Sequence, residues 1–176
     1  MTQRRSMFLI FGFTVVASAW ICHAGPFLRQ QPGMSGELLS LAGLHQVQLH
    51  VEPLQPLLTS QGMTTISLNR MVRGRLREAN IEVVDTANAP VVKITAWPGA
   101  EPALPKALAF NLRISLYQHA TVERVKQRLF VPTYTDFNLG LDKAGKINET
   151  MKTSITVLLD RFLLAVSVAT INASDR

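Results

Sequence analysis

A long apolar stripe near the C-terminus constrains the fold of this sequence more than any other feature. Between residues 147 and 169, apolar side chains recur at steps of three and four, which is the spacing of one face of an α-helix. The stripe consists of Ile147, Met151, Ile155, Leu158, Phe162, Val166 and Ala169. A helix of ~25 residues is ~37 Å long and buries such a face against a second layer. We therefore expect Leu158 and Phe162, in the middle of the stripe, to be core residues.

Period-two alternation predicts that the second layer is a β-sheet. In residues 46–51, QVQLHV, the apolar side chains face one way and the polar ones face the other, as in a half-buried strand. Residues 110–116, FNLRISL, alternate in the same way. Two further short strands are expected at residues 81–85 and 91–97, each bounded by turn residues.

The segment 121–131, TVERVKQRLFV, is ambiguous between helix and strand. Val122, Val125 and Leu129 would also suit a helix, but the preceding strand needs a partner, so we assign this segment to a strand. The stretch 133–146 is polar and rich in turn residues, and it is predicted to be a loop.

A second amphipathic helix is expected at residues 65–79, with Thr65 as its cap and Asn80 as its left-handed stop residue. The predicted fold class is therefore α+β: a two-layer sandwich in which two helices cover one face of a small mixed sheet of about four to five strands. The strand–helix–strand start predicts a parallel pair, and the short links between the later strands predict antiparallel pairs. The other face of the sheet is expected to be polar.

Residues 1–24 have the order of a secretory signal peptide. Arg4 and Arg5 precede an apolar run at residues 7–21, which is shorter than the ~20 residues that a membrane-spanning helix needs. The small residue Ala24 predicts cleavage directly after it. The alternative is an uncleaved membrane anchor.

The one cysteine, Cys22, would leave with that segment, so the mature chain would depend on a hydrophobic core. Lipidation of Cys22 is not expected, because Ile21 stands where lipoproteins need a small residue. Residues 25–43 are rich in proline and glycine and read as a linker. Residues 44–176 form one α/β domain of ordinary size.

The charge is modestly basic. The formal net charge of +6 becomes +4 when Arg4 and Arg5 are removed. A charge of this size suits an anionic membrane surface and falls far short of a nucleic-acid-binding arm, so we expect no nucleic-acid partner. The expected location is periplasmic or secreted, and the alternative is an inner-membrane anchor with the domain facing the periplasm.

Three stretches carry a resemblance to known proteins: HQVQLHVEPL, GRLREANIEVVD and LLDRFLLAV, at residues 45–54, 74–85 and 158–166. Over residues 45–172 the order of elements resembles that of small bacterial envelope domains, among them the LPS-assembly lipoprotein and the amino-terminal domain of the Tol translocation protein. The resemblance implies two helices on one face of a small mixed sheet. The absent lipidation signal departs from the first of these.

Catalytic and metal motifs are missing from the sequence. His45 and His50 are five apart on a strand and point to opposite faces, and no zinc-binding, nucleophile-elbow or phosphate-loop pattern occurs. We therefore expect no metal, no cofactor and no enzymatic activity. A small enzyme with dispersed active-site residues is the alternative.

Basic residues are the best functional lead. Arg70, Arg73 and Arg77 lie at helical steps and form one basic stripe, for which an ordinary solvated helix face is the simpler explanation. A second set, Arg113, Arg124, Lys126 and Arg128, alternates along the predicted hairpin.

A two-residue link at residues 119–120 would place Arg113 opposite Lys126 on the polar side of that hairpin. Directly opposed like charges are unfavourable by up to ~1 kcal/mol, so an anionic partner would explain them. Cations that discourage edge-to-edge aggregation are the alternative.

Taken together, the sequence predicts an exported, non-enzymatic envelope protein with a binding or assembly role. The expected partner is an envelope protein, an anionic lipid or an anionic glycan, and contact with a membrane is compatible with the charge. A membrane-anchored accessory subunit of a larger complex is the competing interpretation. The sequence leaves the oligomeric state open.

Overall fold

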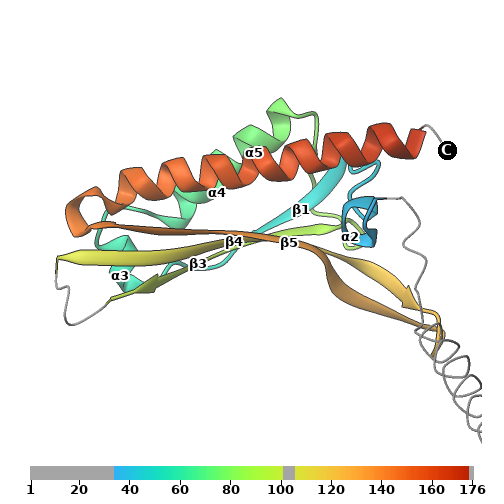
Figure 1. Cartoon of the computed structure of the whole chain (residues 1–176), viewed down its shortest axis with the longest axis horizontal. Helices are drawn as coiled ribbons and strands as arrows, with labels where there is room; N and C mark the ends of the chain where they lie inside the picture. Colours follow the sequence, from blue (N-terminus) through green and yellow to red (C-terminus); the bar gives the residue numbers. More distant parts are fainter. Residues whose placement is uncertain (1–33, 101–105, 175–176) are drawn as a thin grey trace, which may run out of the picture. The chain divides into compact units, whose positions relative to one another are not determined.

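Five strands form one mixed sheet (Figure 1) in the computed structural model, which describes residues 34–100 and 106–174. The strands are β1 (Gln46–Val51), β2 (Glu82–Val83), β3 (Val91–Gly99), β4 (Ala107–Val122) and β5 (Gln127–Lys143). The predicted signal peptide or anchor, the cleavage site after Ala24 and residues 25–33 of the linker lie outside the described residues.

The strand order is β2-β1-β3-β4-β5. β1 is parallel to both β2 and β3, whereas β3 with β4 and β4 with β5 are antiparallel. The predicted parallel pair of β1 with β2 and the antiparallel pairs among β3, β4 and β5 are confirmed. The antiparallel pair expected from the short link between β2 and β3 is not formed, because β1 lies between these two strands and is parallel to both.

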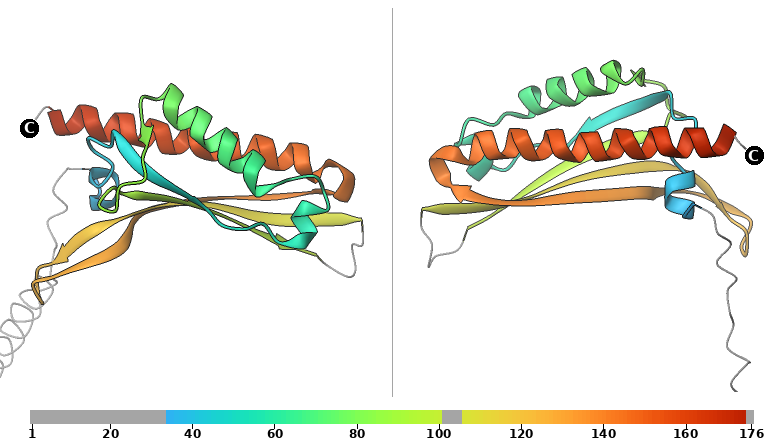
Figure 2. Two further views of the ribbon diagram at one scale, coloured as in Figure 1. Left: turned by 180° about the vertical axis from the view of Figure 1, so that it is seen from behind. Right: turned by 45° about the horizontal axis from the view of Figure 1, so that its top comes forward.

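Two long helices cover one face of this sheet. The helices of the described residues are α2 (Gly36–Leu39), α3 (Pro56–Thr59), α4 (Thr65–Glu78) and α5 (Ile147–Ser174), the last preceded by the short 3₁₀ turn η1 (Ala144–Lys146). Figure 2 shows the two long helices, α4 and α5, on the same side of the strands. The α+β sandwich predicted from the sequence is thus the observed fold.

The boundaries of α4 follow from its capping residues. Thr64, rather than Thr65, is the N-cap, because its hydroxyl accepts a hydrogen bond of 3.0 Å from the backbone N–H of Ser67. Asn80 has a φ of 58°, so the left-handed residue expected after the helix is confirmed.

The apolar stripe of α5 forms the centre of the core. Leu158 and Phe162 are fully buried, as are Leu112 and Ile114 on the facing side of β4. α5 with its preceding turn is long and apolar enough to cross a membrane by length and composition alone. Its buried face makes it the core helix of this fold.

The compact unit begins at Met34, ten residues earlier than the domain boundary expected from composition. Leu41 is fully buried in the core. The Ser40 hydroxyl donates to the Thr133 carbonyl at 3.2 Å, and the Glu37 carboxylate accepts from the Thr135 N–H at 3.0 Å. Residues 34–43 are therefore part of the packed unit rather than of the linker.

The prediction of a loop at residues 133–146 was wrong for residues 133–143, which lie in β5. Tyr134 faces the helices and is buried, and its ring lies 5.6 Å from that of Phe162. Phe137, Leu139 and Leu141 point to the opposite, solvent-facing side. The sheet face that was predicted to be polar therefore carries exposed apolar side chains.

Candidate binding surfaces

A two-stranded ribbon extends beyond the rest of the sheet. β3 starts at Val91, which pairs with Tyr117 of β4, so residues 118–131 of β4 and β5 pair only with one another. Figure 1 shows this ribbon bending away from the layer of the other strands. Its side chains consequently have few neighbours.

A four-residue turn at residues 123–126 closes the ribbon. Val122 pairs with Gln127, and the Val125 N–H donates to the Val122 carbonyl at 3.1 Å. Lys126 adopts a φ of 53°, and its ammonium group pairs with the Glu123 carboxylate. The two-residue link predicted at residues 119–120 was therefore wrong, because those residues lie within β4.

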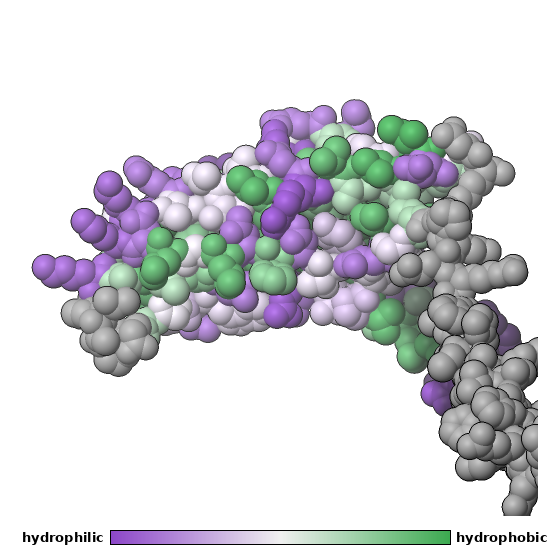
Figure 3. All heavy atoms as spheres, in the orientation of Figure 1, coloured by the Kyte–Doolittle hydropathy of each residue, from purple (hydrophilic) through white to green (hydrophobic). Residues whose placement is uncertain are grey.

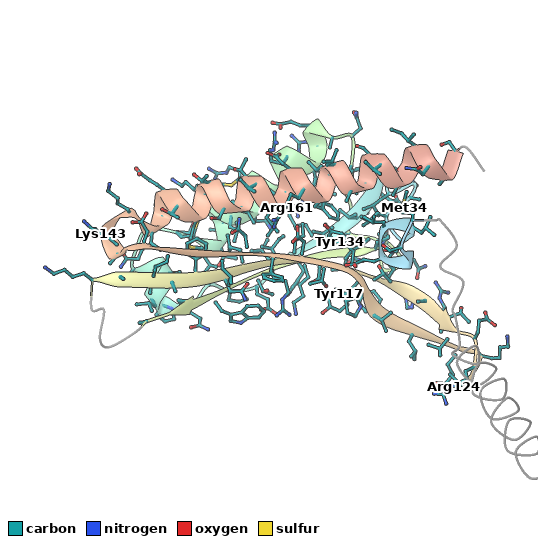
Figure 4. All side chains as sticks on the ribbon, viewed as in Figure 1. Met34, Tyr117, Arg124, Tyr134, Lys143 and Arg161 are labelled. Atoms are coloured by element: carbon teal, nitrogen blue, oxygen red, sulfur yellow. The ribbon has the colours of Figure 1, made fainter. Side chains whose placement is uncertain are left out.

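The corrected register separates the basic residues that were expected to oppose one another. Arg113 pairs with Phe137 rather than Lys126, and Arg128 pairs with Thr121. Arg113 and Thr121 are eight positions apart, which spans about 27 Å at ~3.4 Å per residue, several times the Debye length of ~8 Å at physiological salt. Figure 4 shows Arg124 at the far end of the ribbon. The predicted repulsion between Arg113 and Lys126 is absent.

Arg113 instead belongs to the solvent-facing side of the sheet. Its guanidinium carbon lies 4.6 Å from the centre of the Trp97 ring, an arrangement that allows a cation–π interaction. On the same side, Lys93 pairs with Glu52 at 2.6 Å, and this hydrogen bond raises the pKa of Lys93. Arg113 and Lys93 are thus both engaged by neighbours within the chain.

The end of the ribbon combines apolar and basic side chains. Val125 and Phe130 are 46% and 49% exposed, and the Phe130 ring lies 5.3 Å from the His119 ring. The other exposed apolar residues there are Val122 and Leu129, and the cations are Arg124, Lys126 and Arg128. We call residues 122–130 the ribbon tip.

The α4 arginines form a second basic surface. Arg70, Arg73 and Arg77 line an open groove of roughly 560 Å³ together with Ile66, so the structure brings together the three residues that the helical spacing predicts. The Arg73 Nε donates to Asn69 Oδ1 at 2.8 Å, which fixes the side chain along the helix.

The sequence did not indicate two features of this surface. Gly74 leaves open space on the helix among the arginines, since a Cβ there would meet nothing within 4 Å. A neighbouring groove of roughly 430 Å³ runs from Arg73 and Arg77 to residues 80–83. Its shape depends on how β2 packs beside α4, which spacing along the helix does not reveal.

Arg75 lies on the same helix but outside this groove. It pairs with Glu78 at 2.9 Å and with Asp160 of α5, and these hydrogen bonds raise the pKa of Arg75. Among residues 34–100 and 106–174, no three His, Cys, Asp or Glu side chains gather closely enough to hold a metal ion.

Comparison with known proteins gives a likeness of fold. No protein-family model matches the sequence, and no curated protein matches it. The crystal structure of the rare lipoprotein B from Shewanella oneidensis is similar, with a TM-score of 0.41 and 16% identity, over 73% of this chain and 98% of that chain. A minor lipoprotein from Acinetobacter baumannii is similar with a TM-score of 0.34 and 12% identity, over 73% and 90%. Both neighbours are lipoproteins, as is one of the envelope proteins that the order of elements resembles.

Proposed function

We propose that this protein is exported, is not an enzyme, and docks on an anionic lipid surface in the cell envelope through its ribbon tip. The observation that carries the proposal is the composition of the tip: four exposed apolar side chains beside three cations, of which Lys126 pairs with Glu123, on a ribbon that projects past the sheet. The predicted signal segment at residues 1–24 supports export.

The physical reason is that a lipid surface satisfies both kinds of side chain at once. Apolar groups gain about 25 cal/mol for each Å² removed from water, so Val125 and Phe130 favour the acyl region just below the headgroups. A Lys or Arg close to an anionic leaflet contributes roughly 1 kcal/mol, and Arg124 and Arg128 are exposed beside those apolar groups. Neither attraction alone gives stable attachment, but the two act together.

The test is fluorescence of the full chain with a solvent-sensitive dye on Val125→Cys, in a Cys22→Ser background. We expect a blue shift on addition of phosphatidylcholine vesicles that contain phosphatidylglycerol, and little shift with phosphatidylcholine alone. The variant Arg124→Gln, Lys126→Gln, Arg128→Gln should lose most of the shift. The difference between this variant and the parent protein should be largest at low salt, where exposed charges act furthest.

Two controls separate the tip from total charge and from the rest of the chain. The variant Arg70→Gln, Arg73→Gln, Arg77→Gln removes the same number of cations from α4 and should keep the shift. A dye on Leu164→Cys, which is 65% exposed on α5, should not respond. Equal loss in both triple variants would contradict docking by the tip, since only net charge would then matter.

A further inference from the structure

β5 is the last strand of the sheet, and one of its sides has no neighbouring strand among the described residues. In an antiparallel pair, alternate residues direct both N–H and C=O toward the partner strand, and the residues between them direct both groups outward. The N–H groups of Thr135 and Phe137 bond to side chains rather than to β4. The backbone groups of the odd-numbered residues from 133 to 143 therefore point toward the open edge. This edge is a site at which another strand can pair.

The chain covers the first part of this edge with its own side chains. Helix α2 reaches it from outside: Ser40 donates to the Thr133 carbonyl and Glu37 accepts from the Thr135 N–H. These contacts occupy the Thr133 carbonyl and the Thr135 N–H, two of the backbone groups that a foreign strand would need. Residues 133–135 are therefore closed to pairing.

The next outward residue, Phe137, is covered as well. Its N–H donates to Asp136 Oδ1 at 2.7 Å, and its carbonyl accepts from Arg161 Nη2 at 2.9 Å. Arg161 extends from α5 over the strand, where it also pairs with Asp136 at 2.9 Å; Figure 4 shows it above the sheet.

The cover stops at Leu139 and Leu141. In the part of the chain that the structure describes, no side chain hydrogen-bonds to the backbone of either residue, and the following outward N–H, that of Lys143, is bonded to Asp142 Oδ1 at 2.7 Å. The side chains of Leu139 and Leu141 are also 66% and 64% exposed. One short open segment thus carries free backbone groups and two exposed leucines together.

We propose that this segment pairs with the same segment of a second copy of the chain, antiparallel and two-fold symmetric about Gly140. Leu139 then faces Leu141 of the second copy, and Leu141 faces its Leu139. Each copy supplies two N–H donors and two carbonyl acceptors, so the open segment satisfies itself under the two-fold axis. This inference is independent of lipid docking by the ribbon tip.

The neighbouring side chains fit this register. Asn138 faces Asp142 of the second copy, and Phe137 faces its Lys143, so no like charges are opposed. Gly140 lies at the close, non-hydrogen-bonded position on the axis, where Cα atoms approach to ~4.5 Å. A register shifted toward residue 137 would instead have to displace Arg161.

Apolar surface on α5 lies beside the same edge. Val157 is 43% exposed and lies one turn before Arg161, which contacts the edge at Phe137. Figure 3 shows hydrophobic surface along both β5 and α5 on the side where β5 forms the edge. A paired strand from a second copy would cover part of it.

The test is disulfide trapping between two full-length variants in a Cys22→Ser background, Leu139→Cys and a size-tagged Leu141→Cys. A hydrogen-bonded cross-strand pair has its Cα atoms ~5.5 Å apart, within disulfide range, whereas two copies of position 139 would be beyond ~7 Å. We expect the mixture to give at least tenfold more covalent dimer than either variant alone. Leu164→Cys, with a similarly exposed side chain, should give only background when mixed with Leu139→Cys.

Two edge variants test the same proposal without cysteine. Leu139→Pro removes a free N–H, and Leu141→Lys places a charge on the edge; in sedimentation equilibrium each should weaken self-association at least tenfold while far-ultraviolet circular dichroism is unchanged. Trapping no greater than that of the Leu164→Cys control, or unchanged self-association in Leu141→Lys, would overturn the proposal. So would trapping of Leu139→Cys to a different protein in envelope extracts with no dimer formed.

Discussion

Phe110 and Gly140 form a cross-strand pair in which the phenyl ring occupies the space of a missing side chain. The two residues are directly opposite on β4 and β5, and a Cβ placed on Gly140 would lie 2.2 Å from the ring. Phe110 is 2% exposed. Because Gly140 has no side chain, the Phe110 ring can lie over β5, the edge strand of the sheet.

Gly140→Ala should destabilise the protein by about 1 to 3 kcal/mol, because the added methyl group forces the packed ring of Phe110 to move. Urea unfolding followed by circular dichroism measures the change. Gly99→Ala is the matched control on β3, where the new Cβ would meet Ala109 at an ordinary 3.8 Å. Equal effects in the two variants would show that the ring moves without cost.

Gly74→Ala should act in the opposite direction and raise the free energy of unfolding by up to about 1 kcal/mol. Gly74 lies inside α4, its φ is not positive, and a Cβ there meets nothing within 4 Å. Alanine then reduces the backbone entropy lost on forming the helix. A lower melting temperature for this variant would contradict the open space seen beside Gly74.

Leu158→Asp should cost more than about 4 kcal/mol and leave little folded protein, since a fully buried leucine is replaced by an unpaired carboxylate. Leu164→Asp lies on the same helix at a site 65% exposed and should change stability by no more than about 0.5 kcal/mol. Thermal melts of both variants check the pair. A mild effect of Leu158→Asp would contradict the placement of the α5 stripe in the core.

Most of the fold could be predicted because its core residues recur at regular spacing. β1 lies within the stretch predicted as a strand, and the α5 stripe and the alternating residues of β4 are buried as expected. In each case one apolar face meets the core, so the period of the pattern gives the type of element.

β5 was missed because its pattern is inverted. Phe137, Leu139 and Leu141 face solvent, while Asp136, Asn138 and Asp142 take the helix-facing side. The alternation exists, but the polar residues occupy the side that usually carries core residues. Two of them have polar partners on α5: Arg161 pairs with Asp136, and the Thr150 hydroxyl donates to Asp142. These contacts make the polar residues tolerable on the helix-facing side.

The turn of the ribbon also could not be predicted, because its sequence contains no typical turn residue. Residues 123–126 are Glu, Arg, Val and Lys, and Lys126 takes the positive φ that glycine or asparagine usually provides. Without a turn residue, the sequence does not show where the chain reverses direction. The predicted register therefore placed Arg113 opposite Lys126, whereas it pairs with Phe137. The α4 arginines were found because a helix fixes their relative positions through spacing alone.

Ionisation of Tyr134 should lower the free energy of unfolding as the pH rises from 10 to 12. Burial beneath α5 raises the pKa of Tyr134 from 10.0 to about 12, because the charged phenolate is poorly solvated there. The folded state thus keeps a proton that the unfolded chain releases, so the stabilisation is complete below pH 10 and is lost as the pH rises toward 12. The expected loss is of order 2 kcal/mol.

The measurement is urea unfolding at pH 9 and pH 11.5 for the wild type and for Tyr134→Phe. Phenylalanine has no hydroxyl to titrate, so the variant should lack this part of the decrease. If both proteins lost the same free energy over this interval, the decrease would come from other groups.

Asp142 should become easier to protonate when its hydrogen bond from α5 is removed. The Thr150 hydroxyl donates to Asp142 Oδ2 at 2.6 Å, and the Lys143 N–H donates to Oδ1 at 2.7 Å; these bonds hold the pKa of Asp142 below its ordinary value of 3.8. A lowered carboxyl pKa stabilises the folded state above the ordinary value, and that stabilisation disappears as the pH falls through the folded pKa. Thr150→Val should therefore move the pKa of Asp142 up toward 3.8, measured by carbon-detected carboxylate titration.

Thr156→Val is the control, because that hydroxyl donates to the Lys152 carbonyl of its own helix at 2.9 Å and should leave the Asp142 pKa unchanged. An unchanged pKa in Thr150→Val would mean that the Lys143 N–H alone sets it.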